Sequence, residues 1–216
     1  MFGFDLLGMI AGIPGLIIAM VVHEYAHART AVAMGDFTPR MMGRLTLNPA
    51  AHVDPVGLIM LLVARFGWAK PVIINPRNFK NWRRGELLVA LAGPGANLLT
   101  AFLTVVALGV YLHMGMPLTR GVRMVVYLII IYNINFAIFN MIPLPPLDGS
   151  KVLFSVIKES AYTRLMMIEQ YGSIILFALF ATGILGRPVS ALVSFLYGHM
   201  LPIAQWACDI VFNLYK

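Results

Sequence analysis

An unbroken apolar run from Leu6 to Val22 leads directly into the segment HEYAH at residues 23–27, and this junction limits the folds open to the chain. A helix of about 20 apolar residues spans the hydrocarbon core of a bilayer. On a helix of 3.6 residues per turn, positions i and i+4 share one face, so His23 and His27 can bind one metal ion. The sequence therefore predicts a membrane helix that carries two metal ligands near its end.

The same histidines could instead face a polar interface between helices. However, three ionisable groups within residues 23–27 cost several kcal/mol to bury in lipid unless they share a partner, so a functional site is the default interpretation. Glu24 lies beside both histidines, as it does in a common hydrolytic zinc pattern. We therefore expect one zinc ion per chain, held by His23 and His27 inside a bilayer.

The composition is that of a membrane protein. Of the 216 residues, 60% are hydrophobic and 12% are charged, whereas soluble domains contain about 25% charged residues. The net charge of +7 is explained by basic loops that face the cytoplasm and its anionic lipids, so we expect no nucleic acid partner. Cys208 is the single cysteine, which excludes a disulfide framework and a cluster of thiolate zinc ligands.

Apolar segments predict an all-α polytopic membrane protein with about five to six membrane helices. The short segment 55–65 is about half the length of a span and indicates a re-entrant or interfacial helix. The sequence Gly93-Pro94-Gly95 predicts a kink or local unwinding, because proline removes a helical hydrogen bond, and Pro202 could break the last segment. The long segments are residues 5–34, 87–113, 123–141, 172–185 and 189–214.

A small membrane-associated β element is expected after the first helix. Apolar and polar side chains alternate from Phe37 to Asn48, which is typical of a half-buried strand. Val72 to Ile74, which lies between two prolines, is a candidate second strand. An exposed edge of the first strand could pair with an extended substrate by β-addition.

The basic residues predict an orientation in the cytoplasmic membrane. If the N-terminus lies outside, the basic residues of segments 40–84 and 151–164 fall on one side, against Arg120, Arg123 and Arg187 on the other. The side richer in basic residues is the cytoplasm. The histidines and the proline-rich segment 143–149 then both approach the cytoplasmic side.

A catalytic zinc usually has three protein ligands and one open position for water, so a third ligand is needed. Asp148 is favoured because it ends the proline-rich segment at the depth of His27, where prolines would hold it outside a regular helix. Its alternative role is to cap a helix that begins near Lys151. The other candidate donors are His52, Asp54, Glu86, His113, His199 and Cys208.

Four groups of residues resemble the site-2 protease family of intramembrane zinc metalloproteases, namely segments 23–27, 43–55, 93–97 and 140–149. The resemblance implies that Asp148 completes the zinc site with His23 and His27, and that Glu24 is the general base.

Three more residues are substrate-contact candidates. The resemblance places Asn140 near the site, where its amide could bind a substrate backbone instead of making an ordinary interhelical hydrogen bond. Asn97 could contact the substrate or the oxyanion, or could cap the helix that resumes after Pro94. His52 could support neighbouring groups or bind within a loop turn.

The expected function is hydrolysis of peptide bonds in or near membrane spans of single-span proteins. We expect one domain over residues 1–216, with a core at about 5–157 and extra membrane helices at about 160–214, in a compact form without a PDZ or CBS domain. Its partners are the bilayer and membrane-embedded peptides, and the oligomeric state stays open. The alternatives are an inactive protease-like scaffold, which has no need of Glu24, and a metal or proton transporter, which needs more ionisable groups deep in other spans.

Overall fold

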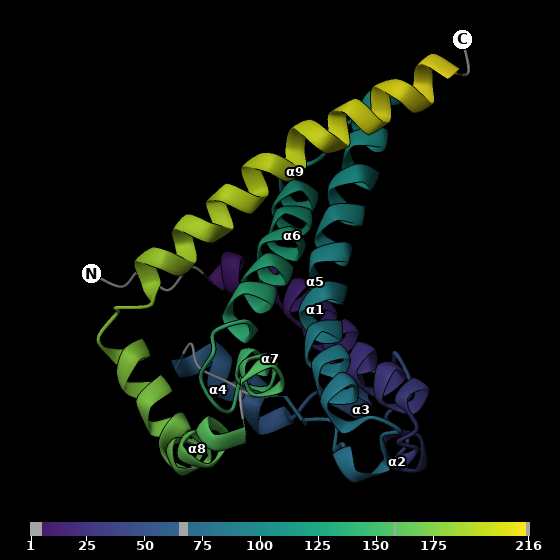
Figure 1. Ribbon diagram of the computed structural model, residues 1–216. Coiled ribbons are helices and arrows are strands. Elements are labelled where there is room, and N and C mark those ends of the chain that lie inside the picture. Colours follow the sequence, from purple (N-terminus) through teal and green to yellow (C-terminus); the bar gives the residue numbers. More distant parts are fainter. Residues whose placement is uncertain (1–5, 65–68, 158, 215–216) are drawn as a thin grey trace.

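The computed structural model describes residues 6–64, 69–157 and 159–214, and every regular element in these ranges is a helix (Figure 1). The all-α prediction is therefore confirmed for the described residues. The long helices are α1 (Leu6–Met34), α5 (Trp82–His113), α6 (Arg120–Asn140), α8 (Glu159–Ala181) and α9 (Gly186–Leu214). The short elements are α2 (Thr38–Met41), α3 (Pro49–His52), α4 (Pro55–Ala64), the 3-10 helix η1 (Pro76–Asn78) and α7 (Asp148–Val156).

The number of membrane helices differs from the prediction. Among the described residues, α1, α5 and α6 are long and apolar enough to cross a membrane, and parts of α8 and α9 form a fourth candidate that bends by 81°. The expected five to six membrane helices are therefore not confirmed. The ten residues of α4 extend about 15 Å, half of a bilayer core. The predicted boundaries at Asp5 and Arg65 lie outside the described residues.

The predicted β element after the first helix is wrong for the described residues. Residues Thr38–Met41 form α2, with Pro39 in its first turn, and Gly43 turns the chain with a φ of 68°. Proline has no N–H for a ladder and a positive φ ends an extended run, so these two residues override the alternating side-chain pattern. Val72 to Ile74 belong to no strand, and an isolated bridge joins Val53 and Ala69.

Prolines inside the long helices do not interrupt them. Helix α5 continues through Pro94 and α9 continues through Pro202. The predicted unwinding at residues 93–95 and the predicted break near Pro202 are therefore not observed. A proline within a membrane helix is tolerated where neighbouring helices satisfy the freed backbone groups, and α5 packs against α1, α6, α7 and α9.

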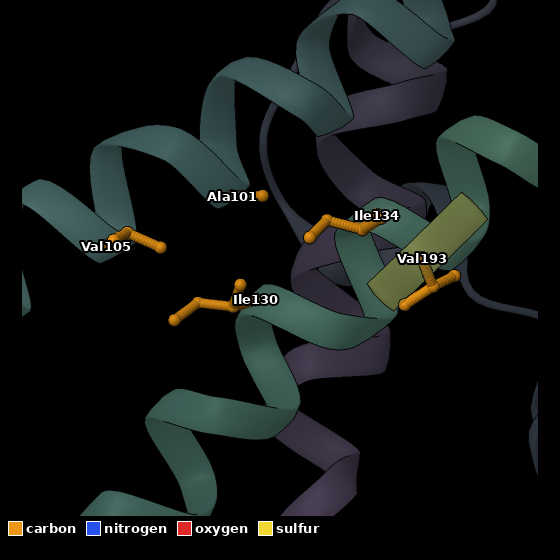
Figure 2. Close-up of a cluster of buried hydrophobic side chains, with 5 residues drawn as sticks. All are labelled: Ala101, Val105, Ile130, Ile134 and Val193. Atoms are coloured by element: carbon orange, nitrogen blue, oxygen red, sulfur yellow. The ribbon is translucent and has the colours of Figure 1, made fainter. Parts of the chain in front are cut away.

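Helices α5, α6 and α9 enclose an apolar cluster (Figure 2). Ala101 and Val105 come from α5, Ile130 and Ile134 come from α6, and Val193 comes from α9. In Figure 1, α9 lies diagonally across the upper ends of α5 and α6, whereas α2 and α7 lie toward the opposite end of the bundle. The cluster fixes α5 against α6, and α1 packs against both of these helices.

A close backbone approach holds α1 against α6. A β-carbon at Gly15 would lie 2.9 Å from Leu128 O and 2.9 Å from Ile129 N, both of which are backbone atoms that cannot rotate away. Small residues at such contacts let membrane helices gain van der Waals contact, because lipid supplies no hydrophobic driving force between them. Gly15 therefore sets the separation of α1, which carries His23 and His27, from α6, which precedes α7 in the chain.

We predict that Gly15→Ala destabilises the protein by about 1–3 kcal/mol, because the added methyl group must push α1 away from α6. Unfolding of the chain by denaturant in detergent micelles measures this change. Gly95→Ala is the matched control, since a β-carbon at Gly95 meets nothing within 4 Å. A Gly15→Ala variant that unfolds at the same denaturant concentration as the wild type would contradict the close approach.

Candidate metal centre

Two imidazoles from α1 and one carboxylate from α7 converge on a single point. His23 Nε2 lies 2.9 Å from His27 Nε2, and Asp148 Oδ2 lies 3.1 Å from each of these nitrogens. All three side chains are buried. Within the part of the chain that the structure describes, this is the one group of three or more His, Cys, Asp or Glu side chains whose ligand atoms lie close enough to hold a metal ion.

The second nitrogen of each imidazole is hydrogen-bonded to a neighbouring helix. His27 Nδ1 lies 2.7 Å from Val89 O, a backbone carbonyl that can only accept, so this nitrogen carries the hydrogen. His23 Nδ1 lies 2.7 Å from Asn97 Oδ1. Asn97 Nδ2 already donates to Ala19 O and to Asn133 Oδ1, which leaves its oxygen to accept from His23.

These contacts determine which atoms face the centre. A neutral histidine with its hydrogen on Nδ1 presents a lone pair at Nε2. His23, His27 and Asp148 Oδ2 therefore present three acceptors to one another with no hydrogen between them, an arrangement that is repulsive without a cation. Ligand atoms that share a tetrahedral zinc ion lie roughly 3.3 Å apart, so the observed separations of 2.9–3.1 Å suit zinc and leave a fourth position open.

Asp148 occupies the first position of α7. It does not lie outside a helix as the proline-rich sequence predicted, and the residue that caps α7 is Leu147. Asp148 Oδ1 lies 3.8 Å from Lys151 Nζ, so Oδ2 is the oxygen that faces the histidines. An ionised carboxylate is the form that binds a metal.

Helix α5 approaches the imidazoles with a glycine at the point of contact. A β-carbon at Gly93 would lie 2.5 Å from His27 Nε2 and 2.6 Å from His23 Cε1. A second glycine, Gly149, allows α7 to pack on the end of α6, because a β-carbon there would overlap the carbonyl oxygens of Met141 and Ile142. Both glycines are needed to bring α1, α5 and α7 together at the centre.

Glu24 follows His23 on α1 and is half-buried. Its Oε2 accepts a hydrogen bond of 2.8 Å from the backbone N–H of Val72. The segment that contains Val72 therefore fixes one carboxylate oxygen of Glu24 beside the candidate metal ligands. The sequence analysis did not find this contact, because a backbone amide that lies 48 residues away leaves no side-chain signal.

Asn97 has a different setting from the predicted substrate contact. Its side chain is completely buried, and its oxygen and nitrogen are used by His23, Ala19 and Asn133. Asn97 therefore orients the His23 ring. Metal-bound histidines usually donate their other ring N–H to an acceptor that fixes the ring in this way. The sequence did not predict that Asn133 would accept a hydrogen bond from Asn97. The only sign of such a role was the amide-rich sequence of α6.

The other candidate residues lie outside the centre. His52 is completely buried, its Nε2 donates to Thr46 O at 2.8 Å, and its Nδ1 has no hydrogen-bond partner among the described residues. Asn140 is half-buried and its Nδ2 donates to Phe136 O one turn earlier in α6. Asp54 accepts from the first amides of α4, at Val56 and Gly57.

The remaining candidate third ligands are also absent from the centre. His113 and His199 are exposed at the surface, and Glu86 is not part of the metal-binding group. The side chain of Cys208 lies outside the described residues. Asp148 is thus the candidate that the structure brings to the two histidines.

Comparison with known proteins agrees with this geometry. The chain is 39% identical over 171 residues to "Putative zinc metalloprotease YwhC" of Bacillus subtilis (strain 168), which covers 77% of this chain and 78% of that protein. The family described as "Peptidase family M50" matches residues 108–185, a range that includes Asp148. The chain belongs to peptidase family M50, the site-2 protease family.

Two mycobacterial proteins are similar over more of the chain. "Putative zinc metalloprotease Rip2" of Mycobacterium tuberculosis (strain ATCC 25618 / H37Rv) is 29% identical over 205 residues, or 92% of this chain and 73% of that protein. Its namesake in Mycolicibacterium smegmatis (strain ATCC 700084 / mc(2)155) is 30% identical over 183 residues, or 81% of this chain and 68% of that protein. No solved structure matches the chain. Membership of family M50 and the apolar helices identify an integral membrane protein.

We predict that Gly93→Ala removes most of the bound zinc, because the added methyl group would occupy space used by both imidazoles. Elemental analysis of the purified protein gives the zinc content per chain. Gly95→Ala, two residues away on the exposed side of α5, is expected to retain zinc. Full zinc content in Gly93→Ala would contradict the described arrangement of ligands.

We also predict that Asn97→Ala weakens zinc binding by about 10- to 100-fold, because His23 loses the acceptor that fixes its ring and tautomer. A competition titration with a chelating dye measures the zinc Kd. Asn135→Ala is the matched control, since Asn135 Nδ2 donates to Ile131 O within α6. Equal zinc Kd values for the two variants would show that Asn97 does not orient the ligand.

Proposed function

We propose that the chain is an intramembrane zinc metalloprotease that hydrolyses peptide bonds in or near the membrane spans of single-span proteins. The observation that carries this proposal is the convergence of His23, His27 and Asp148 as three unprotonated ligand atoms, next to Glu24, in a bundle of membrane-length helices. A scaffold that only binds helices has no use for a buried ligand set with an adjacent base. Family membership supports the same chemistry.

The composition of the other spans argues against the transporter alternative. A path for ions or protons needs ionisable groups at several depths of the membrane. In α5, the charged residues Arg83, Arg84 and Glu86 lie within the first five positions, 82–86, and His113 ends the helix. The polar groups deeper in α5 and α6 are amides and hydroxyls, such as Asn97, Asn133 and Thr100, which carry no charge.

His23, His27 and Asp148 would hold one zinc ion per chain, with a fourth position open to water. When bound, zinc supplies Lewis acidity that lowers the pKa of water toward about 7 and polarises a peptide carbonyl. Asn97 and the Val89 carbonyl keep both imidazoles in the tautomer that binds a metal. Burial of the three ligands excludes bulk water, which strengthens every electrostatic interaction in the site.

Glu24 would act as the general base and then as the general acid. Since the Val72 amide is bonded to Oε2, Oε1 is the oxygen left to take a proton from water as that water attacks the carbonyl carbon. Glu24 would return this proton to the amide nitrogen as the C–N bond breaks, and the second proton of the water would follow to the same nitrogen, which releases an ammonium group and a carboxylate. All protons are accounted for, and the protein forms no covalent bond to the substrate.

A membrane helix must unwind before its peptide bonds can be cleaved, and its freed backbone groups then need partners. Residues 38–41 are helical, so segment 37–48 cannot offer a strand edge to the substrate. We place the substrate-pairing backbone at Val72–Ile74 instead. This segment belongs to no helix or strand, Ile73 is 54% exposed, and no backbone hydrogen bond of Ile73 is found among the described residues. Asn140 Oδ1 could accept from the substrate on another side.

The proposed setting is the cytoplasmic membrane, with the N-terminus outside and the centre toward the cytoplasm. Basic residues support this orientation, because Lys80, Arg83 and Arg84 lie exposed at the end of the bundle where α5 begins. The C-terminal end of α1 and the start of α7 lie at that same end (Figure 1). The positive-inside rule assigns this end to the cytoplasm.

We predict that Glu24→Gln abolishes cleavage and retains zinc, because the amide cannot take a proton and Glu24 is not a predicted ligand. Asp148→Ala should lose both cleavage and zinc. Tagged single-span proteins are reconstituted with each variant in liposomes, and products are followed by immunoblotting, with zinc measured on the same samples. Equal product from Glu24→Gln and the wild type would refute the proposed role of Glu24.

A further inference from the structure

Asp36 is a completely buried carboxylate just beyond the end of α1. The chain turns at Gly35, with a φ of 114°, and Asp36 N donates to Ala31 O at 2.9 Å, which returns Asp36 toward the last turn of α1. Burial disfavours the charged form, but hydrogen bonds from Thr38, Asn75 and Asn78 outweigh it and lower the pKa of Asp36. Asp36 is therefore an ionised group held inside the protein by specific donors.

The donors to Asp36 come from two parts of the chain. Oδ1 accepts from Thr38 N at 3.1 Å, from Thr38 Oγ1 at 2.6 Å and from Asn78 Nδ2 at 2.7 Å, while Oδ2 accepts from Asn75 N at 2.7 Å. Thr38 begins α2, whereas Asn75 caps η1 and Asn78 is the last residue of η1. The carboxylate thus joins the end of α1 to segment 72–78 through both of its oxygens.

Segment 72–78 reaches Glu24 at its other end. Val72 N donates to Glu24 Oε2 at 2.8 Å, and Ile74 packs against the buried cluster of Ala31, Phe79 and Val89. Asn75 lies three residues after Val72, a distance of at most about 10 Å even in a fully extended chain. With Asn75 fixed by Asp36 and Ile74 fixed by packing, the Val72 amide has little freedom to leave Glu24.

We propose that Asp36 is a positioning residue for Glu24. It anchors segment 72–78 along α1, so that the Val72 amide holds Oε2 of Glu24 and leaves Oε1 directed to the reacting water. This inference rests on the proposed function, because Glu24 matters as a base only if the protein cleaves peptides. Asp36 touches neither the metal ligands nor the substrate in this scheme, and acts through the backbone of residues 72–75.

Amide hydrogen exchange tests the linkage without any need for activity. In the whole zinc-loaded chain in detergent, Asp36→Asn should speed exchange at both Asn75 and Val72 by about tenfold or more, because an amide in place of the carboxylate offers a donor where two acceptors are needed. Glu24→Ala should speed exchange at Val72 and leave Asn75 protected. Faster exchange at Asn75 alone in Asp36→Asn would overturn the proposal.

Asp54→Asn is the matched control for this exchange measurement. Asp54 also accepts hydrogen bonds from two backbone amides, but these belong to the start of α4, and asparagine caps a helix as well as aspartate does. Thr38→Val is a milder second variant if Asp36→Asn folds poorly, since it removes one donor and keeps the charge of Asp36. It should speed exchange at Val72 and Asn75 in the same proportion as each other.

Steady-state cleavage gives a second, independent readout. Asp36→Asn should lower kcat by about 10- to 100-fold with zinc content unchanged, because a displaced base slows the chemical step. KM should rise as well, since Asp36 anchors the segment on which the substrate would pair. A wild-type kcat in Asp36→Asn, or a raised KM with unchanged kcat, would overturn the positioning role. If Glu24→Gln cleaves as well as the wild type, the proposed function fails, and the exchange result still decides whether Asp36 holds segment 72–78.

Discussion

Two imidazole nitrogens and a carboxylate oxygen face one another within 2.9–3.1 Å. These atoms repel one another, and the surrounding helices hold them together against this repulsion. Lone pairs that converge in a buried site need a cation or a shared proton. The Nδ1 atoms of His23 and His27 are hydrogen-bonded to Asn97 and to the Val89 carbonyl, so the imidazole rings cannot turn to relieve the repulsion. The packing at Gly93 leaves no room for the imidazoles to separate toward α5.

The amide network around His23 contributes geometry more than stability. Asn97 in α5 bonds to His23 and Ala19 in α1 and to Asn133 in α6, so one side chain joins the three membrane helices. Hydrogen bonds between membrane helices contribute about 0.6 kcal/mol each on average, which is small beside the packing of whole helices. The value of this network lies in keeping one tautomer and one orientation of a ligand.

The sequence predicted the parts of the fold that depend on local patterns. The apolar run and the spacing of His23 and His27 led to α1 and to two candidate ligands, both of which the structure brings to one centre. The resemblance to the site-2 protease family, and not spacing, selected Asp148, because its distance from His27 depends on how α7 packs against α5. Asn97 was assigned to the substrate, since no local pattern reveals which buried atom an amide will meet.

The predicted strand failed for a related reason. Alternation over residues 37–48 reports where side chains point if the backbone is extended, but Pro39 and Gly43 determine that it is not. The expected count of membrane helices is not confirmed, because in the described residues α8 and α9 contribute one bent candidate span in place of two straight ones. In both cases the pattern of apolar and polar side chains is real. It does not determine the path of the backbone, because that path depends on turns and tertiary packing.

In the proposed function, segment 72–75 serves the base and the substrate at once. Its Val72 amide holds Glu24, and the adjoining backbone of Ile73 is the edge on which an unwound peptide would pair. A reaction that loses about 100-fold in rate from a 1 Å misplacement gains from such an arrangement, because the base and the scissile bond are then positioned by the same short piece of backbone. Asp36 anchors that piece to the helix that carries His23 and His27, so that ligands, base and substrate share one frame of reference.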